Sequence, residues 1–552
     1  MLRKQKRRLV YYLSIVSLRL KYKIYLSYWD AMRGILRRRG DTLYIGIDIG
    51  TTSTKALLFD EQGNVLGKSS HGYDILSPAP NKKEQDPDEL YQAVLAVLSE
   101  LVDKAKETQT IEFISFSAVM HSLIAVDKEG KPLTNCMIWA DGRSAEYANE
   151  FKKNGKGIEL YKKTGTPCHP MSPLYKIMWL RDHEEEIFAK TEKFISIKEY
   201  VIFKLFGKYI VDYSIASATG LFNIHELHWE EEAIKAAGIT ADKLSEAVPT
   251  TYKLQGINEE VANEIGIDKN TWVVVGASDG CLANLGSNGI KVGSVVVTIG
   301  TSGAIRIVSD KPLIDHEGRT FCYLLTEDNY VAGGAINNGG MAYRWFRDNF
   351  GEKEMDKAKD QGKDPYYFIN EMIRETEAGS NGLLFIPFLS GERAPYWNAD
   401  LRGSFFGISD THKKRHFARA VIEGISFAIN DVFAILKEYA GKVDTIYVNG
   451  GFTKSKTWVQ ILCDVLGVPI IVSDNYESPC LGACMLGMLA LKKVNDLSEL
   501  SYLLEDGDHY AVSGNHPLYQ KLFKIYQNVI AGSMENFMEL ARIQNRNENE
   551  ME

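Results

Sequence analysis

The sequence predicts an α/β protein made of two similar halves, and three observations lead to this prediction. Residues 44–55 and 295–306 share one pattern, an apolar β-type run that breaks at Gly-Thr-Thr or Gly-Thr-Ser and then resumes. Apolar β-type runs and stretches of helical periodicity alternate along both halves. Glycines cluster at 286, 289 and 293, so we place the boundary there, with domains at 43–290 and 291–540 and a polar tail at 541–552.

Each Gly-Thr break predicts a tight hairpin turn whose backbone N–H groups and small hydroxyls converge on one point. A concave row of such N–H groups is an anion site, and phosphate is its commonest guest. Two copies predict phosphate held between the halves. Lys55 follows the first turn, where it reaches a phosphate or is a solvated strand residue. The candidate phosphate-binding residues in the two turns are Gly50, Thr51, Thr52, Gly300 and Thr301.

In the first half, residues 43–68 predict a β-meander. Asp86-Pro87 then begins a helix with proline in its first turn. Apolar residues recur at helical spacing from Leu90 to Val102, so one face of this helix packs inward. We expect short buried strands at 111–118 and 272–276, and helices at 195–206 and 229–237.

In the second half the order repeats, with a hairpin at 295–308, a strand at 330–333 and a helix through Trp345. A long helix at 417–439, a strand at 445–448 and a helix at 458–466 follow. Seven cysteines without a C-x-x-C pair argue against a disulfide framework or a zinc ribbon. Cys480 and Cys484 lie four apart in an expected helix, where we interpret them as buried apolar residues. A reduced, cytoplasmic compartment is the simplest expectation.

Charge is distributed unevenly along the chain of 552 residues. Residues 1–40 carry a local charge of +11, so the net charge of −8 leaves the remainder at about −19. An acidic body makes nucleic acid an unexpected partner, because polyphosphate backbones bind cationic surfaces. The apolar run at 9–18 is too short to span a bilayer, and no cleavage site follows it. A membrane-surface helix is one interpretation of residues 1–42. We favour translated leader, with Leu43 encoded by a TTG start codon.

Two aspartates stand where chemistry on a phosphate would place them. Asp48 precedes the Gly50 turn by two residues, and a magnesium ion between its carboxylate and the phosphate would relieve their repulsion. Asp279 follows a buried strand and has small neighbours, which leaves room for a ligand. Such a carboxylate can take a proton from a hydroxyl that attacks phosphorus. The structural alternatives are a turn-initiating Asp48 and a simple Asp-Gly turn at Asp279.

Polar clusters at the ends of apolar runs suit a sugar-like ligand. These clusters contain Met120 and His121 in one segment and Trp139, Asp141 and Arg143 in the next. The aromatic ring suits the carbon face of a sugar, and the guanidinium suits its hydroxyls. A strand–glycine–helix order at 449–458 brings backbone close to an adenosine or a phosphate, or is a flexible helix start.

Taken together, these motifs resemble the FGGY family of carbohydrate kinases, in the actin–hexokinase–Hsp70 superfamily. The resemblance covers residues 43–491. It depends on Met171-x-Pro173-x-x-Lys176, on Gly391-Glu392-Arg393-Ala-Pro395, and on Asn449-Gly-Gly-Phe452 with Ser455. Within the family, His169-Pro-Met171 together with Met120-His121 is most similar to the gluconate kinases.

The resemblance implies two actin/hexokinase-like (ribonuclease H-like) domains with a nucleotide and sugar cleft between them. It also implies ATP-dependent transfer to the primary hydroxyl of gluconate, with Mg²⁺. Asp279 occupies the general-base position and Asp48 the position tied to magnesium and catalysis. The carboxylate of gluconate requires a cationic group in the sugar pocket, for which His121, Arg143 and His169 are unranked candidates. The implied nucleotide-binding residues are Gly340, Gly451, Phe452 and Ser455.

Other functions remain open from the sequence. D-xylulose or a related polyol is the closest competing substrate. An actin-type scaffold would not need the sugar clusters, and a silent kinase relative would not need both Asp48 and Asp279. The sequence leaves the oligomeric state open, with a homodimer as one alternative, and no membrane partner is expected.

Overall fold

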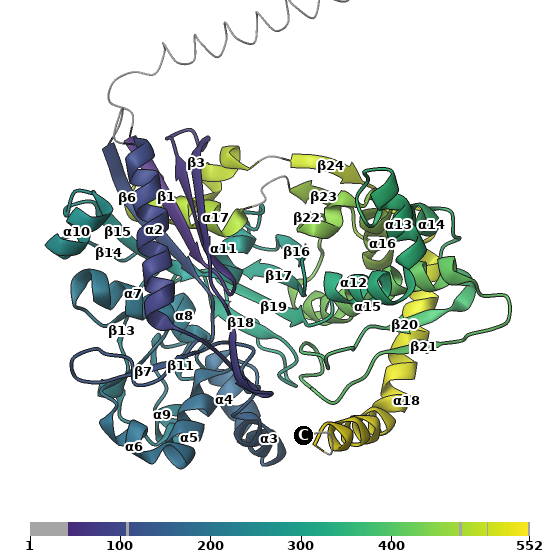
Figure 1. Ribbon diagram of the computed structural model, residues 1–552, viewed down its shortest axis with the longest axis horizontal. Helices are drawn as coiled ribbons and strands as arrows, with labels where there is room; N and C mark the ends of the chain where they lie inside the picture. The colour runs from purple at the N-terminus through teal and green to yellow at the C-terminus, as the bar shows by residue number, and fades with distance from the viewer. Residues whose placement is uncertain (1–41, 106–109, 474–476, 505, 550–552) are drawn as a thin grey trace, which may run out of the picture.

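The computed structural model describes residues 42–105, 110–473, 477–504 and 506–549. The basic segment 1–41 lies outside these ranges, so the leader prediction stays a prediction. Two large sheets carry the architecture, with the N-terminal sheet at the left of Figure 1 and the C-terminal sheet at its centre and right. All seven cysteines lie in the described ranges and are free, and Cys480 and Cys484 are buried as expected.

The N-terminal sheet has the strand order β14-β15-β6-β1-β2-β3. Strands β1, β2 and β3 form the predicted antiparallel meander, while β6 and β15 run parallel to β1 and β14 is antiparallel to β15. The bounds are β1 Thr42–Ile49, β2 Ser53–Phe59, β3 Val65–Gly72, β6 Thr110–Ala118, β14 Lys253–Leu254 and β15 Trp272–Ser278.

The C-terminal sheet repeats this plan in the order β18-β19-β17-β16-β22-β23-β24. Strands β16, β17 and β19 form the second meander, β22 and β23 run parallel to β16, and β24 is antiparallel to β23. Apart from the extra edge strand β18, both sheets share one topology, as the duplicated hairpin predicted. The bounds are β16 Val295–Ile299, β17 Gly303–Ser309, β18 Phe321–Leu324, β19 Tyr330–Ile336, β22 Ile446–Asn449, β23 Ile470–Ser473 and β24 Asp506–Tyr510.

Helices cover the two sheets and build a helical region beneath the N-terminal sheet (Figure 1). In the first half they are α2 Pro87–Ala105, α3 Ala145–Lys153, α4 Lys156–Thr164, α5 Pro173–His183, α6 Glu185–Lys190, α7 Ile197–Phe206, α8 Tyr213–Ser217, α9 Glu231–Ala237, α10 Glu259–Ile265 and α11 Asp279–Leu285. In the second half they are α12 Gly340–Phe350, α13 Glu352–Asp360, α14 Tyr367–Arg374, α15 Lys414–Ala440, α16 Lys456–Leu466, α17 Ser478–Ala490 and α18 His516–Asn549. Short 3₁₀ helices are η1 Ala241–Lys243, η2 Ser380–Gly382, η3 Gly451–Lys454 and η4 Leu497–Leu503.

Smaller strand pairs complete the connections. They are β4 Leu76–Ala79, β5 Lys82–Gln85 and β8 Cys136–Met137 in one sheet, β7 Ile124–Val126 with β9 Lys193–Ile195, β10 Ile210–Asp212 with β13 Glu246–Val248, β11 Phe222–Asn223 with β12 His228–Trp229, and β20 Leu384–Ile386 with β21 Ser404–Phe406. None of the helices in the described part of the chain combines the length and apolarity that crossing a bilayer requires.

Both faces of the N-terminal sheet are buried, because alternate side chains of β1 enter different cores. Leu43 and Ile45 pack in the core that α2 covers, and Tyr44 packs in the core that α17 covers. Helix α17 comes from the second half of the chain, yet a Cβ on Gly46 would lie 2.1 Å from the Cys480 carbonyl oxygen. The two halves therefore share a core at this point.

The expected elements differ from the structure mainly at their ends. The helix expected from Trp229 begins at Glu231, because Trp229 belongs to β12 and the Glu230 side chain caps the helix. The helix expected from Ile195 begins at Ile197, where Ser196 and Glu199 form a capping box. A 3₁₀ turn, η3, lies between β22 and α16, where the sequence predicted only a flexible helix start.

Candidate active site

Two cavities meet between the predicted hairpin turns. The inner cavity, of about 290 Å³, is lined by Thr51 from the first turn, Gly300 from the second, and Asp279. The outer cavity, of about 570 Å³, lies against the C-terminal sheet and is also lined by Gly300. Gly300 is therefore the point at which the two cavities adjoin.

Asp279 is positioned by an irregular end of β15. The pairing of β15 with β6 shifts register between Val274 and Ala277, and Gly276 has a φ of 69°. A Cβ on Gly276 would lie 1.8 Å from the Phe116 carbonyl oxygen, so only glycine fits there. The Lys198 ammonium donates to the Ala277 carbonyl at 2.9 Å and pairs with Asp212 at 2.6 Å, which holds the bulged segment.

Replacing Gly276 by Ala should lower the free energy of unfolding by about 3 kcal/mol or more, because a clash with backbone adds to the positive-φ strain. Gly293 is the matched control, since its φ is 86° and nothing lies within 4 Å of an added Cβ. Gly293→Ala should cost only about 1 kcal/mol. Urea unfolding of both variants measures the difference. Equal losses would contradict the clash at Gly276.

Asp48 and Asp279 affect each other electrostatically. Burial and the neighbouring Asp279 carboxylate raise the pKa of Asp48 to about 7, and a hydrogen bond from the Ser117 hydroxyl at 2.7 Å opposes this. Burial raises the pKa of Asp279 as well, against the attraction of Arg306. The Asp48 carboxylate faces the first turn, because a Cβ on Gly50 would lie 3.7 Å from its Oδ2. Asp48 therefore lies next to the turn, close enough to Asp279 for the two carboxyl groups to interact electrostatically.

His121 lines the inner cavity as a neutral imidazole. Its backbone has a φ of 66°, and burial lowers its pKa to about 3. The Nδ1 atom lies 2.7 Å from the Ala218 carbonyl oxygen, so Nδ1 carries the proton and donates. The Nε2 atom is then the acceptor, with the Tyr323 hydroxyl 3.5 Å away. It can accept from a hydroxyl but supplies no positive charge.

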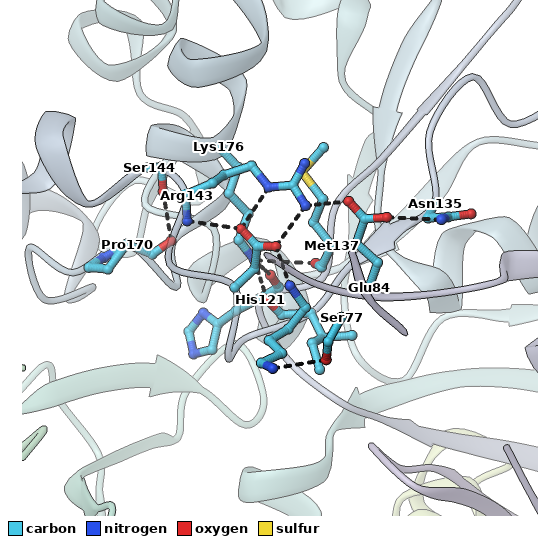
Figure 2. Close-up of polar contacts among 12 residues, drawn as sticks. Ser77, Glu84, His121, Asn135, Met137, Arg143, Ser144, Pro170 and Lys176 are labelled. Atoms are coloured by element: carbon cyan, nitrogen blue, oxygen red, sulfur yellow. Dashed lines mark hydrogen bonds and ion pairs between the residues drawn. The ribbon is translucent and has the colours of Figure 1, made fainter. Parts of the chain in front are cut away.

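The segment that carries His121 rests on a buried lysine. The Lys176 ammonium donates to the carbonyls of His121 at 2.7 Å, Met137 at 3.2 Å and Ile138 at 2.7 Å. Figure 2 shows this contact and the His121 imidazole pointing away from it. Three acceptors match the three protons of an ammonium group, so Lys176 fixes the backbone from which His121 extends.

Asp141 and Arg143 do not line the inner cavity and form an ion pair with each other, so their expected contact with sugar stays a prediction. The Arg143 guanidinium binds Asp141 through Nε and Nη2, both at 2.8 Å, and also pairs with Glu84 (Figure 2). Asp141 accepts a further hydrogen bond from the Lys83 backbone at 2.7 Å. Their charges are already paired within the protein, so Arg143 is less available than an unpaired cation to bind a substrate carboxylate.

The remaining predicted residues near the first turn have their own partners. Lys55 forms an ion pair with Glu477 at 3.0 Å and, like Asp48, lines neither cavity, so its expected contact with phosphate stays a prediction. His169 lies behind the inner cavity, with its ring 5.4 Å from Trp397, and burial lowers its pKa to about 3. Its Nδ1 accepts from the Met171 backbone at 3.2 Å. His169 is therefore also uncharged.

Met120 and Trp139 line the inner cavity as expected. The Trp139 indole donates to the Thr51 hydroxyl at 3.0 Å, which ties the aromatic wall to the first turn. Gly50 and Thr52 belong to the same turn, where Gly50 donates to the Ser53 carbonyl at 3.1 Å and Thr52 is exposed.

The structure brings the predicted C-terminal residues together in the outer cavity. Its lining includes Gly300, Thr301, Gly340, Gly451, Phe452 and Ser455. Gly340 approaches the second turn so closely that its N–H donates to the Gly300 carbonyl at 2.7 Å. Tyr343, Asn370 and Trp458 add polar and aromatic walls that the sequence did not single out.

Two arginines of the inner cavity were not among the predicted site residues. Arg306 lies in the middle of β17, and Arg393 lies in the loop after β20. Arg393 donates to the Asn337 amide oxygen at 2.8 Å and stacks over Trp139 at 4.8 Å. A cation inside the otherwise apolar strand 303–309 is the sequence signal that could have identified Arg306.

Comparison with known proteins decides the family. Residues 43–286 match the N-terminal domain model, and residues 295–491 the C-terminal domain model, of the FGGY family of carbohydrate kinases. The chain belongs to this family. The two-domain FGGY fold accounts for the duplicated sheets, and the resemblance seen in the sequence is confirmed.

Individual FGGY kinases resemble the chain along most of its length. The gluconokinase of Bacillus subtilis is 47% identical over 487 residues, which cover 88% of this chain and 95% of that protein. A gluconate kinase structure from Lactobacillus acidophilus matches with a TM-score of 0.86 and 35% identity, covering 91% of this chain and 100% of the other. A ligand-bound xylulose kinase structure from the same organism also has a TM-score of 0.86 and 35% identity, covering 90% and 100%.

Proposed function

We propose that this FGGY kinase transfers the γ-phosphoryl group of ATP to the primary hydroxyl of D-gluconate, giving 6-phospho-D-gluconate. The observation that carries the proposal is that Gly300 lines both cavities. A nucleotide in the outer cavity would extend its triphosphate past Gly300 into the cavity that contains Asp279. The 47% identity to a gluconokinase supports gluconate as the acceptor.

Asp279 would act as the general base. Its carboxylate takes the proton of the substrate hydroxyl as the oxygen forms a bond to the γ-phosphorus and the bond from that phosphorus to the β–γ bridging oxygen breaks. ADP carries away the electron pair of the broken bond. The raised pKa of Asp279 suits a base, because a more basic carboxylate holds the incoming proton better. Alignment of hydroxyl and phosphorus contributes on the order of 7–11 kcal/mol of barrier reduction.

Asp48 would hold a magnesium ion that arrives with ATP. The described residues contain no cluster of three or more potential protein ligands, which fits a Mg²⁺ ion that keeps water and phosphate oxygens as its other ligands. The Asp48 carboxylate also faces the Gly50 turn, where phosphate is proposed to bind. When bound, the ion would neutralise phosphate charge beside the two carboxylates.

Several neighbours would position these groups. Lys176 supports the His121 backbone, and the ion pair of Asp141 with Arg143 holds the adjoining segment. His121 Nε2 would accept a hydrogen bond from a sugar hydroxyl. Gly50, Thr51, Thr52, Gly300 and Thr301 would hold phosphate oxygens, and Gly340, Gly451, Phe452 and Ser455 would line the adenosine site.

An acceptor screen tests the function. ATP consumption by the purified enzyme is measured with gluconate, xylulose, glycerol, ribulose and fuculose, and the product is identified by mass and phosphorus NMR. We expect kcat/KM for gluconate to exceed that for every other acceptor by about 100-fold or more. Preferential phosphorylation of xylulose would contradict gluconate as the substrate. Xylulose is the second candidate because a xylulose kinase structure also matches the chain.

A further inference from the structure

Arg306 is a buried cation with two hydrogen-bond donors that find no acceptor in the described part of the chain. Its Nε and Nη1 atoms are inaccessible to solvent and have no hydrogen-bond acceptor among the residues that the structure describes. The side chain lines the inner cavity together with Thr298, whose hydroxyl is likewise buried and without a partner. Buried donors of this kind are costly unless something accepts from them. Both residues border the same cavity, so their unsatisfied polar groups favour a ligand that carries oxygen acceptors.

The protein provides room for this arginine at two glycines. Arg306 pairs with Gly333 across β17 and β19, and a Cβ on Gly333 would lie 3.2 Å from the Arg306 Cγ. A Cβ on Gly280, at the start of α11, would lie 3.4 Å from its Nε and Nη2. The aliphatic part of the side chain therefore packs over Gly333, and the guanidinium packs against Gly280. This arrangement places Arg306 in the cavity wall, where it interacts electrostatically with Asp279.

We propose that Arg306 binds the carboxylate of a sugar-acid substrate and thereby selects aldonates over uncharged polyols and ketoses. The inference rests on the proposed function and names the residue that gives it its specificity. A guanidinium matches a carboxylate with two parallel N–H donors, a geometry that an uncharged hydroxymethyl group cannot reproduce.

Charge balance in the inner cavity supports an anionic acceptor. Of the described residues that line it, Arg306 and Arg393 carry cationic groups, Asp279 carries the one carboxyl group, and His121 is neutral. Cationic side chains therefore outnumber carboxyl groups in the lining, which favours an anionic ligand. Arg393 already donates from Nε to Asn337 and from Nη2 to the Ile336 carbonyl, at 2.8 and 3.2 Å. Arg306 has the unoccupied donors.

The position of Arg306 along its strand favours the acceptor over the nucleotide. Strand β17 begins at Gly303, directly after the second turn, and Arg306 lies three residues further on. At about 3.3 Å per residue, its backbone lies about 10 Å from the strand end that would hold the triphosphate. Arg306 also lines only the inner cavity of the two. A γ-phosphate contact is therefore the less favoured source of the anion.

The test compares two acceptors that differ in one group. D-gluconate and D-glucitol share their carbon chain, but glucitol has a hydroxymethyl group in place of the carboxylate. Dissociation constants for both are measured by calorimetry without nucleotide, and kcat/KM with ATP, for the wild type and for Arg306→Gln and Arg306→Lys. Arg374→Gln is the matched control, because Arg374 is exposed and pairs with Glu371 on the surface. Melting curves confirm that each variant is folded.

Arg306→Gln should weaken gluconate binding and lower its kcat/KM by about 100-fold or more, and leave both values for glucitol unchanged or improved. Arg306→Lys should recover part of the gluconate binding, and Arg374→Gln should match the wild type.

Equal losses of kcat for both acceptors, with unchanged gluconate binding, would overturn the proposal and assign Arg306 to the phosphoryl group. A wild type that prefers an uncharged acceptor would end the proposed function and this inference together. If the wild-type enzyme phosphorylates gluconate and Arg306→Gln binds and phosphorylates it equally well, the role of Arg306 would be excluded while the proposed function would stand.

Discussion

Asp279→Asn is expected to lower kcat for gluconate phosphorylation by about 1,000-fold, because the amide cannot take the proton of the attacking hydroxyl. The fold should be preserved. The Gly280 N–H donates to Asp279 Oδ1 at 2.7 Å, and an asparagine oxygen accepts the same bond. Steady-state kinetics give the loss of turnover. ATP binding, measured by calorimetry, should stay within about two-fold of the wild type, since Asp279 does not line the outer cavity.

Asp268→Asn is the matched control for this variant. Asp268 precedes the same strand, is exposed and accepts from the Asn270 backbone at 2.8 Å, a bond that asparagine keeps. Its turnover should equal that of the wild type. Turnover near the wild-type level in Asp279→Asn would remove Asp279 as the base.

Asp48→Asn is expected to lower kcat by several hundred-fold, on the order of a lost charge-stabilising group in an active site. The hydrogen bond from Ser117 persists, because the asparagine oxygen accepts it. The amide removes the negative charge that would hold magnesium. Activity should therefore require a higher magnesium concentration, which titration of Mg²⁺ at saturating ATP measures. Binding of Mn²⁺ to the ATP complex, followed by electron paramagnetic resonance, is a second readout.

Asp60→Asn is the matched control for Asp48→Asn. Asp60 lies in the exposed turn after β2 and accepts from the Gln62 and Asn64 backbones, at 3.0 and 2.8 Å. It should show the wild-type dependence on magnesium. An unchanged magnesium requirement in Asp48→Asn would place the ion elsewhere.

Local signals predicted the parts of the fold that local chemistry determines. Each hairpin turn could be predicted because Gly-Thr-Thr or Gly-Thr-Ser interrupts an apolar strand. Residues of both turns line the inner cavity. Asp279 was readable because small residues surround it at a strand end. The glycine turn at 450–451 likewise predicted a ligand-facing backbone, and Gly451 lines the outer cavity. These features depend on neighbours in sequence.

Contacts between residues far apart in the chain could not be predicted from the sequence. Lys55 was assigned to phosphate because it follows a turn, but its partner Glu477 lies 422 positions later. Arg143 was assigned to the substrate, but the structure pairs it with Glu84, 59 positions earlier. Arg306 was missed, because only the folded sheet places it against Gly280 and Asp279. A charged residue finds its partner through tertiary packing, which motif spacing does not record.

The central claim is that the γ-phosphoryl group passes Gly300 from the outer cavity to a sugar hydroxyl beside Asp279. A crystal structure with magnesium, a non-hydrolysable ATP analogue and D-gluconate tests it most directly. We expect the γ-phosphorus to lie between Gly300 and the primary hydroxyl, with that hydroxyl hydrogen-bonded to Asp279 and the carboxylate bound to Arg306. A triphosphate directed away from the inner cavity, or a primary hydroxyl remote from Asp279, would contradict the account.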